Sequence, residues 1–315
     1  MSFLILTISL FFLIIASNYL VKETDRLAAS IRISPLIIGS TLIAFGTSLP
    51  EFSVTISSIA QKVPDLSLGN IIGSNICNIF LVLGISILFF PVRMGTQKTQ
   101  RNNIILLITT LIFIAYFFVP KIYSTYLLYA LVTGYALFLI IEIIWGEIGS
   151  KKEDKKALSK LKKEKSPALV TAIKLLLAIA TIIISSKFLV TSAEAIALLF
   201  KIKDEIIGLT LIAFGTSIPE LSTSIASGFR KDWKLIVGDI QGSNIFNLSI
   251  LGTITLLYSK DGVNTLNIIS LSFLALATLI SFYLTRKYEG ENIPRYYGLV
   301  FIAFYSSYIL LIFLR

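Results

Sequence analysis

The chain has 315 residues, of which 55% are hydrophobic and only 15% are charged, whereas an ordinary soluble domain has about 25% charged residues. With a mean hydropathy of +0.85 it lacks the polar surface that a water-soluble globule needs, so we predict an all-α protein that crosses a membrane repeatedly. Histidine is absent and Cys77 is the single cysteine, which excludes His-based triads, HExxH zinc sites, histidine proton relays, internal disulfides and thiolate metal clusters.

Ten apolar segments are long enough to cross a bilayer, which takes about 20 helical residues. The first has neither a basic n-region nor a small-residue cleavage site, so we expect a transmembrane helix and not a signal peptide. The ten predicted spans are 3–21, 35–60, 66–90, 103–120, 124–145, 168–190, 205–229, 235–258, 264–284 and 296–314.

The basic residues are divided unequally between the two sides of the predicted membrane. The loops after the odd-numbered spans carry 20 of the 28 lysines and arginines, and the other loops and the two tails carry 7. The basic side is expected to face the cytoplasm, which places both termini outside a cell membrane. This rule accounts for the net charge of +10 without a nucleic-acid partner. The charged segment 146–166 is predicted to be a cytoplasmic linker, either a solvated, partly helical tether or a regulatory or lipid-headgroup contact.

The chain contains a long internal repeat. Residues 36–51 read LIIGSTLIAFGTSLPE, residues 205–220 read EIIGLTLIAFGTSIPE, and 13 of the 16 positions agree at an offset of 169. The same offset pairs GNIIGSN at 69–75 with GDIQGSN at 238–244, and Asn78 with Asn247. This agreement indicates a duplication. Five spans, an odd number, separate equivalent points, so we predict two inverted five-helix repeats, 1–145 and 167–315, with motifs at 44–78 and 213–247. Inverted repeats with broken helices near the midplane are typical of secondary transporters.

The repeated segment predicts a helix break inside each apolar span. Pro50 and Pro219 have no N–H group, so the carbonyls of Gly46 and Gly215 lose their helical partners and the helix bends. At membrane depth a loosened carbonyl must be satisfied by protein, water or an ion.

Oxygen-bearing side chains follow these breaks at helical spacing. Two helix faces are predicted in each repeat, at i, i+3, i+4, i+7 and at i, i+4, i+8. The set is Ala44, Thr47, Ser48 and Glu51 with Asn70, Ser74 and Asn78, and Ala213, Thr216, Ser217 and Glu220 with Asp239, Ser243 and Asn247. Oxygen ligands suit hard cations, and Ca²⁺ takes about 6–8 of them, whereas softer metals favour imidazole or thiolate.

Acidic residues in the spans differ in their expected depth. Glu51 and Glu220 lie about 15 residues into their spans, where a charge costs at least ~2.5–3.5 kcal/mol; the alternative to ion binding is a pair of protonated glutamates bonded to the helix breaks. For Ser74 and Ser243 the alternative is close helix packing. Asp239 is expected near the cytoplasmic face as a vestibule residue. Glu142, Glu194 and Asp25 are expected near span ends, as snorkelling or paired groups.

The doubled motif resembles a known family. GTSLPE and GTSIPE, each followed by G-(N/D)-x-x-G-S-N-x-x-N, resemble the repeats of the cation/Ca²⁺ exchanger superfamily, above all its prokaryotic Na⁺/Ca²⁺ exchangers, over the whole chain. The resemblance implies ten helices and a central Ca²⁺ site made by Glu51, Glu220 and the carbonyls of Thr47 and Thr216. It implies flanking Na⁺ sites made by the Ala44 carbonyl, Ser48, Ser74 and Glu51, and by the Ala213 carbonyl, Ser217, Ser243 and Glu220, with Asn78 and Asn247 completing the ring.

One position departs from that pattern. Many Na⁺/Ca²⁺ members have aspartate where this chain has Asn247, and K⁺-dependent members also use one. The core is therefore expected to hold two acids instead of three, which argues against K⁺ dependence.

These observations together predict a transporter and not an enzyme. We expect a monomeric secondary antiporter, without a cofactor, that exports Ca²⁺ in exchange for Na⁺ by alternating access. A Ca²⁺/H⁺ antiporter that uses the same glutamates is the nearest alternative, and a cation channel is an alternative of another class. An intramembrane protease is rejected, because Gly238-Asp239 is only a fragment of a di-aspartyl motif.

Overall fold

The computed structural model describes residues 1–30, 44–94, 97–149, 168–229, 231, 233–259 and 268–314. Within these ranges the secondary structure is helical, and β pairing is confined to an isolated bridge between Arg93 and Asn292. The elements of the first half are α1 (Ser2–Ser30), α3 (Ala44–Thr47), α4 (Leu49–Ala60), α5 (Pro64–Cys77), the π-helix η2 (Asn78–Leu83), α6 (Gly84–Phe89), α7 (Gln97–Ala115) and α8 (Lys121–Gly149). Those of the second half are α10 (Ala168–Phe200), α11 (Asp204–Ile207), the π-helix η3 (Gly208–Ile212), α12 (Ala213–Thr216), α13 (Ile218–Phe229), α14 (Trp233–Phe246), the π-helix η4 (Asn247–Leu251), α15 (Gly252–Tyr258), α16 (Ile268–Lys287) and α17 (Tyr296–Phe313).

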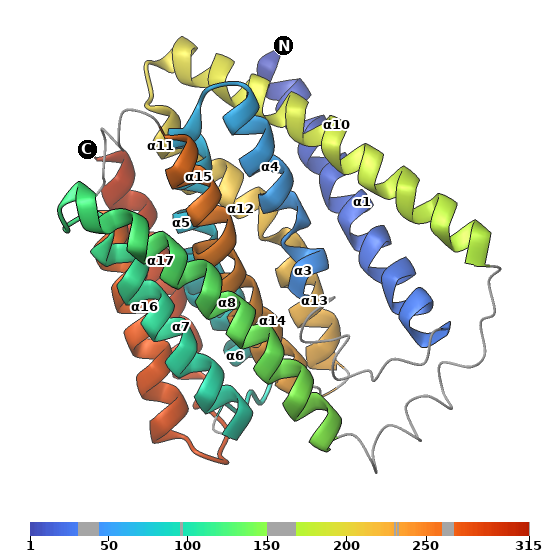
Figure 1. Cartoon of the computed structure of the whole chain (residues 1–315), viewed down its shortest axis with the longest axis vertical. Helices are drawn as coiled ribbons and strands as arrows, with labels where there is room; N and C mark the ends of the chain where they lie inside the picture. The colour runs from blue at the N-terminus through green and yellow to red at the C-terminus, as the bar shows by residue number, and fades with distance from the viewer. Residues whose placement is uncertain are drawn as a thin grey trace.

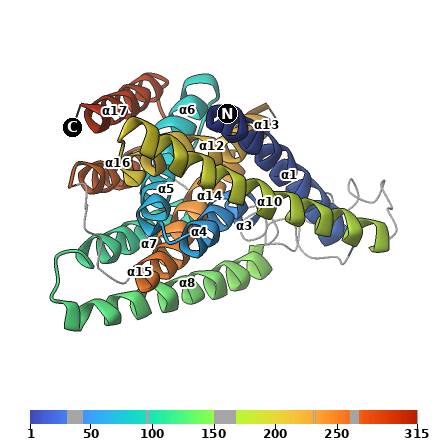
Figure 2. The ribbon, with the colours of Figure 1, turned by 90° about the horizontal axis from the view of Figure 1, so that it is seen from above.

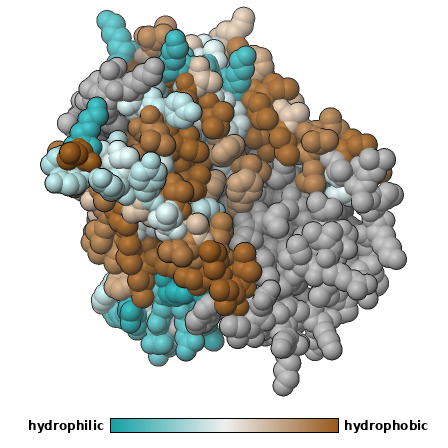
Figure 3. Space-filling view, in the orientation of Figure 1, coloured by the Kyte–Doolittle hydropathy of each residue, from teal (hydrophilic) through white to brown (hydrophobic). Residues whose placement is uncertain are grey.

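Seven helical segments of the described chain are long and apolar enough to cross a membrane. In the coloured part of Figure 3 hydrophobic side chains form a broad area, and many of the hydrophilic ones gather toward the top and bottom of the view. The predicted spans at 3–21, 35–60 and 103–120 do not reach this standard and stay predictions; part of 35–60 lies outside the described residues. The seven segments are Pro64–Phe89, Lys121–Ile144, Ile173–Phe200, Asp204–Phe229, Leu235–Tyr258, Ile268–Lys287 and Tyr296–Phe313.

Two helix ends differ from the predicted span ends. Helix α7 ends at Ala115, short of the predicted end at 120, and a turn leads to Pro120, whose ring cannot continue a helix. Helix α8 runs on to Gly149 and so includes the first residues of the predicted linker; residues 150–166 lie outside the described residues, and the linker at 146–166 stays a prediction.

The core of the molecule is built on the two helices that follow the repeated motifs. The spans Pro64–Phe89 and Leu235–Tyr258 are the most buried of the seven. Figure 1 shows α7, α16 and α17 on one side of this core and the long pair α1 and α10 on the other, and in Figure 2 α8 and α17 lie at opposite edges of the bundle. Helices α1 and α10 pack along one another, and α10 also contacts α4. The segments α3, α4, α12 and α13 therefore lie between the α1–α10 pair and the core.

Glycine lets two backbones meet in the core. A Cβ atom on Gly69 of α5 would lie 2.4 Å from the carbonyl oxygen of Glu205, and one on Gly208 of η3 would lie 2.3 Å from that of Leu66. No side chain can occupy either position without moving a helix. Small residues thus allow the close helix contact that is common in membrane bundles.

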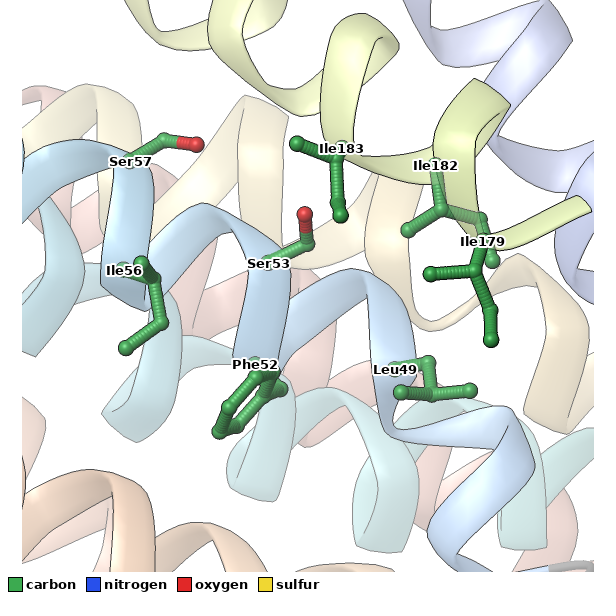
Figure 4. A pocket seen from close by; sticks show the side chains of 8 residues that line it. All are labelled: Leu49, Phe52, Ser53, Ile56, Ser57, Ile179, Ile182 and Ile183. Atoms are coloured by element: carbon green, nitrogen blue, oxygen red, sulfur yellow. The ribbon is translucent and has the colours of Figure 1, made fainter. Parts of the chain in front are cut away.

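The contact between α4 and α10 is looser. A cavity of about 190 Å³ separates these helices, and its walls are apolar except for Ser53 and Ser57 (Figure 4). Next to it, Ser53 and Ser57 bond to the hydroxyl of Ser186 on α10 at 2.6 and 3.0 Å. A few polar contacts therefore join the two helices where apolar packing is incomplete. The lining residues are Leu49, Phe52, Ser53, Ile56, Ser57, Ile179, Ile182 and Ile183.

Glu142 forms a buried ion-pair cluster between α7 and α8. Its carboxylate lies 2.8 Å from Lys98 Nζ, pairs with Arg101 and accepts a 3.0 Å hydrogen bond from Asn102. The expectation that Glu142 is a paired group is therefore confirmed. This cluster lies outside the repeated motifs and explains why α7 tolerates a polar first half.

Candidate cation-binding site

Both repeated motifs contain the predicted helix break. Helix α3 ends at Thr47 and α4 begins at Leu49, with Ser48 between them at φ −82°, ψ 6°. Helix α12 ends at Thr216 and α13 begins at Ile218, and Ser217 has φ −82° and ψ 1°. Each proline thus lies in the first turn of the second segment, where its missing N–H is tolerated. Each break is therefore confined to one residue, Ser48 or Ser217, and the segments before and after it are helical.

Two carbonyls next to the breaks accept hydrogen bonds. The Ala213 carbonyl accepts a 3.1 Å bond from the backbone N–H of Ser217 and a longer one, 3.4 Å, from the Thr216 hydroxyl. The Ser48 carbonyl accepts one from the N–H of Phe52 at 3.0 Å. The loosening of the Gly46 and Gly215 carbonyls, which face the prolines, stays a prediction.

Glu51 and Glu220 are fully buried, and their carboxylate oxygens have no hydrogen-bond partner at normal distance, although the hydroxyls of Thr216 and Ser74 interact with Glu51 and that of Thr47 interacts with Glu220. Both lie in the first turn of a helix, α4 and α13, where the helix dipole favours a negative charge. The ion pairs found in the described chain involve other acids. A buried carboxylate without a partner is costly unless a cation or a proton neutralises it. The geometry therefore leaves both glutamates available to a cation.

The threonine hydroxyls connect the two repeats in matching pairs. Thr47 Oγ1 donates to Asp239 Oδ1 at 3.1 Å and lies 3.3 Å from Ser243 Oγ. At equivalent positions, Thr216 Oγ1 donates to Asn70 Oδ1 at 3.1 Å and lies 3.2 Å from Ser74 Oγ. Each break thus contacts the α5 or α14 helix of the other repeat.

This crossing adds a neighbour from the other repeat to the expected grouping of the serines. The resemblance placed Ser74 with Ser48 and Glu51, and Ser243 with Ser217 and Glu220, and that grouping stays a prediction. Ser74 lies beside Thr216, which precedes Ser217, and it also interacts with Glu51; Ser243 lies beside Thr47, which precedes Ser48. The reason for the added contacts is that the helices of the two repeats interleave, which residue spacing within one helix cannot show.

Asp239 corrects the expected number of core acids. It was expected in a vestibule near the cytoplasmic face, but it is fully buried and accepts the hydrogen bond from Thr47. It also interacts electrostatically with Glu51 and Glu220. The core therefore holds three acids. The signal in the sequence was the repeat equivalence of Asp239 and Asn70; its position nearly two turns into α14 came from the structure.

The asparagines are arranged unequally. Asn78 Nδ2 donates to Asn244 Oδ1 at 3.0 Å, and Asn244 Nδ2 donates to the Asn75 carbonyl at 3.2 Å. The amide of Asn247 is buried and has no partner for either atom. Asn78 and Asn247 are also the first residues of the π-helices η2 and η4, which often mark functional positions. Sequence reasoning missed Asn244 and all three π-helices, η2, η3 and η4.

The ligands that these residues offer are oxygens of mixed type. The hydroxyls of Ser48 and Ser217 are buried and unpartnered, like the glutamate carboxylates. Among the described residues, no three His, Cys, Asp or Glu side chains converge closely enough to hold a metal ion. Hydroxyl, amide and carbonyl oxygens would therefore have to complete any coordination shell, as hard cations allow.

Comparison with known proteins places the chain in a family. Residues 1–144 and 170–314 match the family described as sodium/calcium exchanger protein. The putative antiporter CaxA of Alkalimonas amylolytica is 36% identical over 255 residues, 79% of either chain. The uncharacterized membrane protein MJ0091 of Methanocaldococcus jannaschii is 30% identical over 304 residues, 95% of this chain and 93% of that protein. The sodium/calcium exchanger MaX1 of Methanosarcina acetivorans is 26% identical over 350 residues, 99% of this chain and 98% of that protein.

A solved structure has the same fold. The sodium-calcium exchanger NCX_Mj, soaked with 2.5 mM Na⁺ and 10 mM Sr²⁺, superimposes with a TM-score of 0.69 at 27% identity, over 98% of this chain and 99% of that one. The fold, the doubled motif and the match over both halves agree, and the chain belongs to the sodium/calcium exchanger protein family.

Proposed function

We propose that this protein is a secondary antiporter that exports Ca²⁺ in exchange for Na⁺ by alternating access, as a monomer in the cell membrane. The observation that carries this proposal is the pair of fully buried, unpartnered carboxylates of Glu51 and Glu220 at equivalent helix breaks. MaX1 bears the name sodium/calcium exchanger, and NCX_Mj was also solved after soaking with 2.5 mM Na⁺ and 0.1 mM Ca²⁺, which supports Na⁺ and Ca²⁺ as the ions here.

The proposed Ca²⁺ ligands are the Glu51 and Glu220 carboxylates and the carbonyls of Thr47 and Thr216. For Na⁺ we assign two flanks according to the observed threonine–serine contacts. One flank has the Ala44 carbonyl, Ser48 and Ser243, the other has the Ala213 carbonyl, Ser217 and Ser74, and Asn78 and Asn247 complete the ring.

Charge explains why such a core would exchange ions and not leak them. One Ca²⁺ cancels the charges of Glu51 and Glu220, so the loaded centre is close to neutral with respect to this pair. Without an ion, two negative charges remain in a medium where each one costs at least ~2.5–3.5 kcal/mol. The empty carrier is therefore penalised when it changes conformation, and a loaded one is favoured.

The proposed architecture is ten transmembrane helices in two inverted repeats with both termini outside. It is supported by the repeat at an offset of 169 residues and by hydrogen bonds that recur at the same offset, from Thr47 to Asp239 and from Thr216 to Asn70. The start of α1 and the end of α17 both lie in the upper part of Figure 1. Inverted repeats of this kind are a common basis of alternating access.

Transport into proteoliposomes tests the proposal. Vesicles loaded with Na⁺ and diluted into Na⁺-free buffer with labelled Ca²⁺ should accumulate Ca²⁺, and vesicles without the Na⁺ gradient should not. Accumulation driven by an imposed pH gradient in Na⁺-free buffer would instead establish the Ca²⁺/H⁺ antiporter. Equal Ca²⁺ entry with neither gradient would establish a channel, and either result would contradict the Na⁺-driven mechanism.

A further inference from the structure

We propose that Asp239, together with the hydroxyls of Thr47 and Ser243, forms a site for a monovalent cation, with Na⁺ as the fitting ion. The equivalent place on the other flank has Asn70 and is neutral. The two flanks of the core therefore differ by one charge. This inference rests on the proposed function, because it adds a ligand to one of the two Na⁺ flanks.

Oxygen atoms of three buried residues lie together at this place. Thr47 Oγ1 donates to Asp239 Oδ1 at 3.1 Å. Ser243 Oγ lies 3.3 Å from Thr47 Oγ1. The two hydroxyls therefore border the carboxylate of Asp239 with neutral oxygens, and the oxygen without a partner is Oδ2 of Asp239.

The second carboxylate oxygen of Asp239 has no compensation in the protein. Asp239 is fully buried and its Oδ2 has no hydrogen-bond partner. The ion pairs of the described chain leave it out. A buried anion in that condition needs a counter-charge.

The opposite flank is a built-in comparison. Thr216 bonds to Asn70 Oδ1 at 3.1 Å, as Thr47 bonds to Asp239 Oδ1. The atom without a partner is Nδ2 in Asn70 and Oδ2 in Asp239. An amide N–H repels a cation and a carboxylate oxygen attracts one, although the surrounding hydroxyls are the same.

The charge of the site indicates a monovalent ion. Asp239 adds one negative charge that the equivalent flank with Asn70 lacks, and the hydroxyls of Thr47 and Ser243 that contact it are neutral. One carboxylate balances one monovalent cation. In the proposed orientation α14 begins beside the basic loop that contains Lys231, so the acidic flank is the one nearer the cytoplasm.

Thermal unfolding of the purified protein in detergent tests this site without transport. The melting temperature is measured against Na⁺ concentration, with choline chloride keeping the ionic strength constant, since an ion that binds the native state raises the melting temperature with saturation. Asp239→Asn should raise the Na⁺ concentration at half-saturation about tenfold, the effect of losing a charged ligand. The double variant Asn70→Asp/Asp239→Asn, which moves the carboxylate to the other flank, should return the midpoint close to the native value.

The controls separate ion binding from a structural role. Glu194→Gln removes an acid outside the core and should leave the Na⁺ midpoint unchanged. If Asp239→Asn lowers the melting temperature equally at every Na⁺ concentration with an unchanged midpoint, Asp239 is structural and the site is wrong. A double variant that behaves like Asp239→Asn would also overturn the idea that this one charge distinguishes the flanks. If Asp239→Asn does not fold, Asn70→Asp alone should lower the midpoint, and an unchanged midpoint overturns the proposal.

Transport by the native protein distinguishes the two proposals. Absence of Na⁺-driven Ca²⁺ flux, with Na⁺ stabilisation that Asp239→Asn weakens, would refute the exchanger function and leave the cation site in place. Na⁺-driven flux together with an unchanged midpoint would refute the site and leave the function in place.

Discussion

Asn78 donates its side-chain N–H to the side-chain oxygen of Asn244 across 3.0 Å, which joins the first residue of η2 to α14 of the other half. The repeat equivalent of Asn78 is Asn247, whose buried amide has no partner. Two asparagines in equivalent places are therefore used differently: one holds two helices together, and the other is available to an ion or to water.

Asn247→Asp should change the pH dependence of exchange. The variant adds a fourth buried acid, which must either hold a proton, so that exchange falls where the proton is lost, or bind cations too firmly, so that turnover slows. Ca²⁺ binding should persist in either case. The measurement is Na⁺-driven Ca²⁺ flux against pH, with the neutral variant Asn247→Ser as control. Superimposed pH profiles and maximal rates for Asn247→Asp and the native protein would show that Asn247 does not face the ions.

Glu51→Gln and Glu220→Gln should each reduce Ca²⁺ flux to the background of empty liposomes, because each removes half of the charge that balances Ca²⁺. The neutral amides also relieve the cost of a buried charge, so both variants should fold, as size-exclusion chromatography and thermal unfolding would show. Glu194→Gln is the matched control and should keep native flux. Near-native flux in either core variant would refute the central site.

Cysteines placed at Ser150 and Ser159 in a Cys77→Ser background should react with an impermeant maleimide only from the cytoplasm, and a cysteine at Ser2 only from outside. The reason is the unequal division of basic residues between the two sides. Labelling is compared in intact cells and in inverted vesicles. Reversed accessibility would invert the proposed orientation and put the Asp239 flank on the outer side.

Gly208→Ala should destabilise the protein by about 1–3 kcal/mol, as overpacking does, and lower its transport rate. The new Cβ would lie 2.3 Å from the Leu66 carbonyl oxygen, a backbone atom that can move only with α5. Gly134→Ala is the control, because nothing lies within 4 Å of its Cβ position and alanine favours a helix by about 1 kcal/mol. Equal melting temperatures for both variants would show that α5 and η3 do not need this close contact.

Local rules predicted much of the site. The missing N–H of each proline located the breaks at Ser48 and Ser217, and helical spacing placed Asn70 and Ser74 on one helix face. Both predictions succeed because they depend only on a few neighbouring residues. Sequence reasoning did not place Ser74 beside Thr216, because that contact depends on how two helices cross. It also misjudged the depth of Asp239, since depth depends on the packing around α14 and not on distance from the apparent end of a span.

The number of residues in the π-helices that begin at Asn78 and Asn247 determines how the helical segment after each of them is rotated. A π-helical turn holds more residues than an α-helical one, so each residue gained or lost rotates the following segment by about 100°. The number of residues in η2 therefore determines which face of α6, the helix that contains Ser86, contacts α17. The amino-acid types in η2 matter no more than this number. A single deletion between residues 79 and 83 would keep a continuous helix and present a different face of α6 to α17. Homologous exchangers can thus diverge through insertions and deletions inside a transmembrane helix, and an alignment without gaps there would pair residues that face different neighbours.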